Sequence, residues 1–251
     1  MADGEVVLEG GIAILAALES ASRPITRIFI ESRVRFERDA ARIRRMAADA
    51  GVAVEIADAG QIAVLAQGKT HGGLIALAGE RRTLPLEALA AGIDSPFVAM
   101  LDGIEDPYNF GQAIRALYAA GADGLVLRPR SWMSAAGVVA RASAGASERM
   151  PTAVAETVEG AAEAFRGRGM QIVVAAKERA VPLYEADLTG GVFLVIGGEK
   201  RGITRSFAES ADLRLSIPYG REYSHSLGTV AATAVIAFEV LRQRRALRRD
   251  R

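Results

Sequence analysis

The sequence predicts an α/β protein, with a C-terminal parallel sheet preceded by a smaller N-terminal α/β unit. Short apolar runs alternate with stretches of helical spacing along nearly the whole chain. The chain has 251 residues, 50% of them hydrophobic, so it can build one large core or two smaller ones. Polar, glycine-rich stretches follow several of the apolar runs, which is typical of the ligand-binding edge of a parallel sheet.

The first part of the chain predicts a compact α/β unit. The expected helices are Gly11–Leu18, Arg35–Ala50 and Gly60–Leu65, and the expected strands are Arg27–Glu31, Val52–Ile56 and Gly73–Ala78. We therefore expect residues 1–82 to form the first domain. Residues 83–95 have the turn residues of a linker, with Pro85 near the start and Pro96 just beyond the end.

From Phe97 the alternation starts again and continues to the C-terminus. The expected strands are Phe97–Leu101, Gly124–Leu127, Gln171–Ala175, Gly191–Ile196 and Leu213–Ile217. The expected helices are Phe110–Ala120, Ala135–Ala142, Val158–Arg166, Arg205–Ser210 and Leu227–Arg245. Because helices separate the apolar strands, we expect residues 96–251 to form a parallel sheet with helices on both faces.

The composition excludes several kinds of site. The chain has no cysteine, which excludes disulfides, thiolate metal sites and cysteine nucleophiles. Its two histidines, His71 and His225, are too few for a histidine-rich metal site. The N-terminus lacks the pattern of a signal peptide, and no run reaches the roughly 20 apolar residues of a membrane span. We therefore expect a soluble, cytoplasmic protein that holds no metal.

The net charge of +1 indicates no partner, but the arginines are clustered. One cluster, between the first expected strand and the helix after it, contains Arg33, Arg35, Arg38, Arg42, Arg44 and Arg45. A second cluster at the C-terminus contains Arg242, Arg244, Arg245, Arg248, Arg249 and Arg251. Clustered arginine suits contact with phosphate. The alternative is a solvated helix face, since Glu37 and Asp39 interleave with the first cluster.

Three of the expected strands end in polar, glycine-rich loops. The first loop, after Phe97–Leu101, and the helix it enters contribute Asp106, Pro107, Asn109, Gly111 and Arg115. The second is Gly197-Gly198-Glu199-Lys200-Arg201-Gly202, and the third runs from Ile217 to Gly228. None contains the dinucleotide fingerprint or the P-loop spacing. Taken alone, Glu199 would belong to a surface salt cluster, and Arg115 would pair with Asp106 or a helix neighbour.

Together the three loops resemble the motifs of the SpoU-type (TrmH-like) RNA 2′-O-ribose methyltransferases of the SPOUT superfamily. The first is similar to the family's D-P-x-N-x-G-x-x-x-R element, the second to its G-x-E-x-x-G element, and the third to Ile-Pro followed by Ser-Leu. Ser143-Ala144-Gly145-Ala146 resembles a further family stretch. The N-terminal unit, with Thr70-His71-Gly72-Gly73-Leu74 near its end, resembles the family's ribosomal-protein-like substrate-binding domain.

The resemblance covers nearly the whole chain and implies both a fold and a reaction. Family members have a parallel sheet whose C-terminal segment forms a deep trefoil knot, and they act as homodimers through the last helix. That helix carries an apolar surface that suits an interface or the chain's own core: Val230, Val235, Ile236, Phe238 and Leu241. The implied enzyme transfers a methyl group from S-adenosylmethionine to a ribose 2′-hydroxyl of RNA, with ribosomal RNA favoured over transfer RNA.

By the same resemblance, the catalytic residues are Arg115, Asn109, Glu199 and Ser226. Arg115 would contact RNA phosphate and the target ribose, and it would position and stabilise charge because arginine is too basic to accept a proton readily. Asn109 would orient Arg115 and Glu199, and the Ser226 hydroxyl would support the site. The expected cofactor-binding residues, acting mostly through backbone atoms, are Gly197, Gly202, Ile217, Pro218, Leu227 and Ala176.

Two positions depart from the family pattern. Gly228 stands where family members carry an asparagine that hydrogen-bonds in the site, and Gly73 stands where many carry glutamine. The alternative function is therefore a non-catalytic RNA-binding member of the same fold, weakened at Gly228. A third hypothesis is an α/β enzyme that acts on a small molecule, but the N-terminal unit and the clustered arginines disfavour it. His71 suits either RNA contact or a partly buried structural role.

Overall fold

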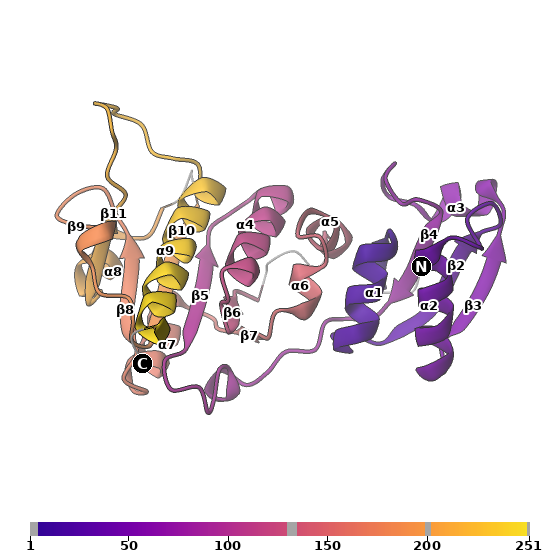
Figure 1. The fold of residues 1–251 in the computed structure, drawn as a ribbon, viewed down its shortest axis with the longest axis horizontal. Helices are drawn as coiled ribbons and strands as arrows, with labels where there is room; N and C mark the ends of the chain where they lie inside the picture. The colour runs from indigo at the N-terminus through magenta and orange to yellow at the C-terminus, as the bar shows by residue number, and fades with distance from the viewer. Residues whose placement is uncertain (1–4, 130–134, 199–201, 250–251) are drawn as a thin grey trace. The chain divides into compact units, whose positions relative to one another are not determined.

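The computed structural model describes residues 5–129, 135–198 and 202–249. They divide into two compact units, each with its own hydrophobic cluster (Figure 1). The first unit comprises residues 5–82 together with 135–149, and the second comprises the remaining described residues from 83 onward. The segment 135–149 thus packs with the N-terminal part of the chain, although it comes from the middle of the sequence.

The first unit contains a four-stranded mixed sheet. Its strands lie in the order β1 (Val6–Glu9), β4 (Leu74–Ala78), β2 (Ile25–Glu31) and β3 (Ala53–Ala57). β4 is antiparallel to both neighbours, whereas β2 and β3 are parallel. The helices are α1 (Gly11–Ser20), α2 (Arg38–Asp49) and α3 (Ala59–Leu65). The sequence predicted these elements except β1, which precedes the first expected helix.

Two short helices from the middle of the sequence, α5 (Ala136–Ala142) and α6 (Ala146–Arg149), belong to this unit. Ala140 is buried in the same hydrophobic cluster as Leu8 and Ile14. A Cβ atom on Gly137 would lie 2.2 Å from the carbonyl oxygen of Val7, so α5 lies directly against β1. The Ser143–Ala146 stretch forms the turn between the helices, with Ala144 and Gly145 at φ 50° and 77°.

A buried ion pair holds α6 against the start of β2. The Glu148 carboxylate accepts hydrogen bonds from Arg23 Nε at 2.9 Å and Arg23 Nη2 at 3.0 Å, and the Ser22 hydroxyl donates to it at 2.6 Å. The side chains of Arg23 and Glu148 are only 4% and 1% exposed. The pair therefore joins residues more than a hundred positions apart inside one core.

The second unit contains a seven-stranded sheet in the order β7-β6-β5-β10-β8-β11-β9. Every neighbouring pair is parallel, which confirms the predicted parallel sheet. The sequence did not predict β7 and β9, which have only 3 and 2 residues. The strands are β5 (Phe97–Asp102), β6 (Gly124–Leu127), β7 (Thr152–Val154), β8 (Gln171–Ala175), β9 (Val181–Pro182), β10 (Val192–Gly197) and β11 (Leu213–Ser216).

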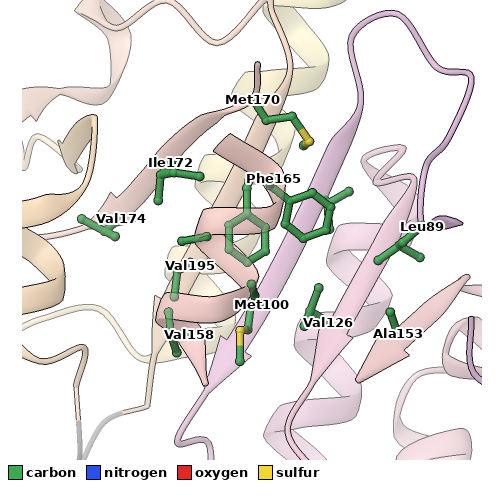
Figure 2. Packing of buried hydrophobic residues seen from close by; sticks show 14 of the residues in the cluster. Leu89, Met100, Val126, Ala153, Val158, Phe165, Met170, Ile172, Val174 and Val195 are labelled. Atoms are coloured by element: carbon green, nitrogen blue, oxygen red, sulfur yellow. The ribbon is translucent and has the colours of Figure 1, made fainter. Parts of the chain in front are cut away.

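Helices cover both faces of this sheet. Phe165 of α7 (Val158–Arg166) packs among strand residues such as Met100 and Val195 (Figure 2), and Phe207 of α8 (Arg205–Ser210) belongs to the same cluster. The Phe165 and Phe193 rings lie 4.6 Å apart between centroids. On the other face, α4 (Pro107–Ala119) and α9 (Thr229–Arg249) lie side by side (Figure 1).

Three helices begin two or three residues away from the predicted start. α4 begins at Pro107 instead of Phe110, because the Asp106 carboxylate caps it by accepting the Asn109 N–H at 2.6 Å, and proline suits the first helical turn. α9 begins at Thr229, shortly after the predicted start at Leu227. α2 begins at Arg38 instead of Arg35, because residues 32–36 form a turn.

No helix in the described ranges, the long α9 included, has the length and apolar character needed to cross a membrane. The deep trefoil knot that the family resemblance implies stays a prediction, as does the threading of the C-terminal segment.

Candidate active site

The loops that follow β5, β10 and β11 leave the parallel sheet at one edge. β10 pairs with β5 on one side and with β8 on the other, and β11 pairs with β8. Because the carboxyl ends of parallel strands meet at the same edge, all three motif-bearing loops start there. An open α/β sheet binds its ligands at this edge.

Gly198 brings the β10 loop into direct backbone contact with the β5 loop, and Gly197 lets the β10 loop pack closely against itself. The Gly198 N–H donates to the carbonyl oxygen of Asp102 at 2.7 Å. A Cβ atom on Gly198 would lie 2.0 Å from the carbonyl oxygen of Gly103, and one on Gly197 would lie 2.6 Å from the amide nitrogen of Ile203. No side chain fits at either position, so the second motif needs its glycines for this close approach.

Helix α4 carries the predicted catalytic residues of the first motif. Asn109 is half-buried in the first turn, and Arg115 is exposed further along the helix. Arg115 is eight residues beyond Pro107, about 12 Å along the helix axis. Within the part of the chain that the structure describes, no acidic group pairs with Arg115, because Asp106 caps α4 instead.

The structure brings some of the predicted catalytic residues to one edge but does not connect them. No hydrogen bond joins the Asn109 side chain to Arg115 among the described residues. Ser226 is exposed in the loop that precedes α9. Glu199 lies outside the described residues. The proposed roles of these four residues therefore stay predictions.

The loop after β11 forms an open depression of about 450 Å³. Its lining is mostly apolar and aromatic, with one charged side chain, and consists of Ile217, Pro218, Tyr219, Gly220, Arg221, Tyr223 and Leu227. The Tyr219 hydroxyl accepts a hydrogen bond from the Leu227 N–H at 3.0 Å, which closes the loop on itself. The Lys177 ammonium donates to the Ser224 carbonyl at 2.8 Å and ties the loop to the segment after β8.

The predicted cofactor-binding residues fall into neighbouring groups on this edge. Ile217, Pro218 and Leu227 line the depression together. Gly202 lies beside Gly197, since its Cα is 3.0 Å from the position of a Gly197 Cβ. Thr229 at the start of α9 donates its hydroxyl hydrogen to the Gly197 carbonyl at 3.4 Å, which links the third motif to the second.

Ala176 lies at the exit of β8, between the strands that carry the second and third motifs. Its N–H donates to the Leu215 carbonyl of β11 at 2.8 Å. This bond extends the ladder between β8 and β11 by one residue beyond the end of β8. The Ala176 N–H is therefore already used within the sheet, so only its carbonyl and methyl groups are free to face a ligand.

The residues of this edge suit a neutral aromatic ring better than a phosphate. The depression offers apolar side chains and backbone atoms, and the adjoining glycine loop exposes backbone groups at close range. Adenine is recognised well by such a site, because hydrogen bonds from backbone atoms fix its orientation while apolar side chains cover its faces. The lining therefore fits the adenosine part of S-adenosylmethionine.

Sequence reasoning missed several residues that shape the site. Asp102 at the end of β5 pairs with Arg128, whose Nε lies 2.7 Å from Oδ1. Tyr219 and Lys177 hold the third loop through the bonds to Leu227 and Ser224. The available signal was an aspartate at the end of an apolar strand and a tyrosine after Ile-Pro, but neither belongs to the motifs that carried the resemblance.

His225 and the tyrosines form a small aromatic cluster beside the depression. The Tyr219 and Tyr223 ring centroids lie 6.2 Å apart, and the His225 ring meets Tyr223 edge-on at 5.4 Å. Across the described part of the chain, no group of three or more His, Cys, Asp or Glu residues is arranged to hold a metal ion.

Comparison with known proteins agrees with this geometry. Residues 96–238 match the model of the SpoU rRNA Methylase family, and residues 7–84 match the model for RNA 2′-O ribose methyltransferase substrate binding. The 23S rRNA (guanosine-2′-O-)-methyltransferase RlmB of Yersinia pestis is 30% identical over 245 residues, covering 95% of this chain and 97% of its own. RlmB of Ralstonia nicotianae is 31% identical over 240 residues, covering 95% and 96%.

Solved structures show the same fold over nearly the whole chain. The SpoU methyltransferase AviRb of Streptomyces viridochromogenes, in complex with the cofactor AdoMet, has a TM-score of 0.81 at 21% identity and covers 97% of this chain and 92% of its own. An AdoMet-bound rRNA methyltransferase of Sinorhizobium meliloti has a TM-score of 0.79 at 23% identity and covers 96% and 88%. The matched residues and the strand-exit motifs together show that this chain belongs to the SpoU family of RNA methylases.

Proposed function

We infer that this protein transfers a methyl group from S-adenosylmethionine to the 2′-hydroxyl of a ribose in ribosomal RNA. One observation carries the inference. In a chain of the SpoU family, the glycine loop of β10 and the depression of the β11 loop meet at one sheet edge. Helix α4 begins there and carries Arg115, which has no acidic partner among the described residues. An enzyme that binds a nucleoside cofactor and holds an RNA ribose requires these parts.

The β11 loop and the β10 exit would hold the cofactor. Ile217, Pro218 and Leu227 would cover the adenine, and Gly197 and Gly202 would present backbone atoms to the ribose and the methionine part. When bound, the cofactor supplies an electrophilic methyl group on a sulfonium. The chain's task is then to hold the RNA 2′-oxygen in line with that methyl group and to keep water away.

Arg115 is the residue that we assign to the RNA at the reacting centre. Its guanidinium is a permanent cation with five donors in a planar fork, which suits bidentate contact with a phosphate next to the target ribose. It would fix the ribose and stabilise charge on the 2′-oxygen as its proton leaves. Asn109, Ser226 and Glu199 would orient the groups around it by hydrogen bonds.

We propose large-subunit ribosomal RNA as the substrate, because the RlmB relatives act on 23S rRNA. The arginine cluster of the first unit and the basic end of α9 would contribute phosphate contacts. Such a substrate also supports the cytoplasm as the place of action, since ribosomes are assembled there.

We further propose that the active form is a homodimer whose interface is the surface that α4 and α9 form side by side. Phe238 of α9 is 47% exposed, and Tyr108 and Tyr118 of α4 are 54% and 41% exposed, although both helices pack against the sheet on their other sides. Arg115 shares the exposed side of α4 with these tyrosines and lies about 12 Å along the helix from the strand exit. That separation supports a contribution of Arg115 to the site of the partner subunit.

The first experiment is methyl transfer from labelled S-adenosylmethionine to unmodified bacterial ribosomal RNA, with Arg115→Ala as the control. We expect label on ribose, and loss of that label in the control while cofactor binding persists. Absence of label on ribosomal and transfer RNA, with cofactor and RNA still bound, would instead identify a non-catalytic RNA-binding member of the family. In that case, Gly228→Asn tests directly whether the missing asparagine is the reason.

A further inference from the structure

Phe36 is the most exposed phenylalanine of the chain, and nothing in the proposed reaction accounts for it. Of the eight phenylalanines, five are buried: Phe97, Phe110, Phe165, Phe193 and Phe207. Phe36 is 79% exposed, against 47% for Phe238, which faces the proposed dimer interface. Exposing a whole phenyl ring forgoes the stabilisation that burial gives a large apolar side chain.

The ring is presented by a well-anchored turn at residues 32–36, between β2 and α2. Val34, in the middle of the turn, is buried in the core cluster of the first unit. The Val34 N–H donates to the Glu31 carbonyl at 3.0 Å, and the Glu37 N–H donates to the Val34 carbonyl at 2.9 Å. Because Val34 points inward and is held on both sides, its neighbours Arg33, Arg35 and Phe36 project into solvent.

The surroundings of Phe36 are strongly basic. The Arg35 guanidinium carbon lies 4.7 Å from the centroid of the Phe36 ring, a cation–π contact that leaves most of the ring exposed. Residues 33–45 contain six arginines and two carboxylates. Two of these arginines are neutralised by other elements, since Arg33 pairs with Glu31 at 2.5 Å and Arg42 pairs with Glu19 at 2.5 Å.

The turn lies beside the segment that leads into β4. The Glu31 N–H donates to the Gly73 carbonyl at 2.8 Å, and a Cβ atom on Gly73 would lie 2.9 Å from the Glu31 side chain and 3.0 Å from the Val34 side chain. His71, in the same segment, accepts the Gly73 N–H at its Nδ1 at 3.0 Å. The Phe36 turn and the His71 segment are therefore adjacent in the first unit.

We propose that Phe36 is a stacking site for an unpaired base of the RNA substrate, with Arg35 and the neighbouring arginines holding the flanking phosphates. This inference rests on RNA being the substrate, as proposed above, and adds which residues recognise an unpaired stretch. An exposed aromatic ring within a basic surface is how proteins bind single-stranded RNA, because every base offers a stacking face. A protein partner would need a carboxylate-rich surface for the arginines and an apolar pocket for the Phe36 ring. RNA needs no such pocket, because the arginine forks bind its phosphates and a base stacks on the ring.

The test measures binding of the full-length protein to an RNA oligonucleotide of about ten nucleotides, single-stranded or paired with its complement, over a series of salt concentrations. Phe36→Ala should weaken binding of the single strand roughly fivefold to 140-fold, the effect of losing one stacked base. The salt dependence of that binding should not change, because no phosphate contact is lost. Arg38→Ala should instead lower the slope of log affinity against log salt by about 0.7.

Two further variants make the result specific to stacking. Phe36→Trp keeps a flat ring, so it should restore the affinity, and its fluorescence should be quenched when the single strand binds. Val64→Ala removes an apolar side chain that is 85% exposed in the same unit but outside the arginine cluster, and it should change nothing. Unchanged far-ultraviolet circular dichroism in each variant shows that the fold is kept.

The outcomes separate this inference from the proposed reaction. Wild-type affinity in Phe36→Ala, an equal loss on the duplex and the single strand, or no binding of the wild type at low salt would overturn the stacking site. Even if the wild type transfers methyl groups, any of those results would still rule out the stacking site. Conversely, Phe36-dependent binding in a protein that transfers no methyl group would keep the stacking site and refute the reaction.

Discussion

Arg115 combines exposure, a fixed charge and the absence of any acidic partner among the described residues. A surface arginine kept for stability usually pairs with a carboxylate, as Arg205 does with Glu209 at 2.9 Å. Arg115→Lys retains the positive charge but replaces the planar fork by a point charge. If the fork positions the phosphate, kcat for methyl transfer should fall on the order of 10²-fold, because small displacements at the reacting atoms are costly.

The matched control for that variant is Arg205→Lys, which makes the same chemical change on the exposed side of α8. Its methyl transfer rate should equal that of the wild type. Cofactor affinity, measured by calorimetry, should be unchanged in both variants. A rate for Arg115→Lys equal to the wild type would mean that charge alone suffices and that Arg115 does not position the RNA.

Glu148 should make the stability of the first unit depend on pH. Burial raises the pKa of its carboxyl group, but the charge and hydrogen bonds of Arg23, with Arg81 and Ser22, outweigh burial and hold the pKa below its usual 4.5. The unfolded chain then binds more protons than the folded chain in this range. The stabilisation is fully present above about pH 4.5 and is lost as the pH falls through the folded pKa.

Glu148→Gln leaves the buried Arg23 without its counter-charge. We expect the free energy of unfolding at pH 7, from urea titration, to fall by about 3–5 kcal/mol. We also expect the acid sensitivity of unfolding to decrease, because the titrating group is gone. Glu19→Gln, which alters the exposed pairs with Arg42 and Arg149, should cost about 1 kcal/mol or less. Equal losses in the two variants would contradict the role of the buried pair.

Motifs in the sequence predicted several residues that lie at one sheet edge but not how the structure holds them. Gly197, Ile217 and Leu227 were assigned by resemblance, and the structure places them at one sheet edge. The Tyr219 hydroxyl that accepts the Leu227 N–H was not foreseen, because a hydrogen bond inside an irregular loop has no sequence period. The same holds for the bond from Lys177 to Ser224, which joins two loops.

At the exit of β10, the backbone packs tightly against the β5 loop. A Cβ atom on Gly198 would lie 2.0 Å from the Gly103 carbonyl oxygen, and backbone cannot move aside as a side chain can. Gly198→Ala should therefore separate the β10 and β5 loops. We expect a loss of about 1–3 kcal/mol in the free energy of unfolding, the usual cost of overpacking.

The same variant should bind S-adenosylmethionine more weakly, because the displaced loop carries Gly197 and Gly202. Gly190→Ala is the control, since nothing lies within 4 Å of a Cβ atom there. It should bind the cofactor like the wild type and have unchanged stability. Normal cofactor affinity in Gly198→Ala would show that the β10 exit does not contribute to the cofactor site.

Elements with a full apolar period were predicted within a few residues, whereas several of the shortest elements were missed. β5 and β10 are continuous apolar runs, so their strands could be read from the sequence. β1, β7 and β9 have 4, 3 and 2 residues and exist because a neighbouring strand supplies their hydrogen bonds. The early start of α4 is set by Asp106 and Pro107, which were interpreted as a loop.

At the level of the whole molecule, contacts remote in sequence decide how the chain is divided. Residues 135–149 pack with β1 and α1 through Ala140, Gly137 and the Arg23–Glu148 pair. The periodicity of α5 indicates a helix but does not indicate which core it joins, because an apolar face fits either unit. The buried ion pairs of Glu148 with Arg23 and of Arg141 with Glu9 specify the partner, and sequence alone does not reveal those pairings.

The proposed dimer is the remaining property of the whole molecule, and α9 offers a sharp test of it. Phe238→Glu places a charge in the centre of the exposed surface shared by α4 and α9. Leu247→Glu introduces the same charge at a side chain of nearly equal exposure, 46% against 47%, on the opposite side of the same helix. Light scattering should give the wild type and Leu247→Glu twice the chain mass of 26.5 kDa, and Phe238→Glu a single chain mass.

If Arg115 acts in the site of the partner subunit, the monomeric Phe238→Glu should also lose methyl transfer while it still binds S-adenosylmethionine. Mixing Phe238→Glu with Arg115→Ala should not restore activity, because the charged surface prevents pairing. A wild type that elutes as a monomer at micromolar concentration, or a monomeric Phe238→Glu with full activity, would contradict the dimer as the active form. The second result would place Arg115 in the site of its own chain.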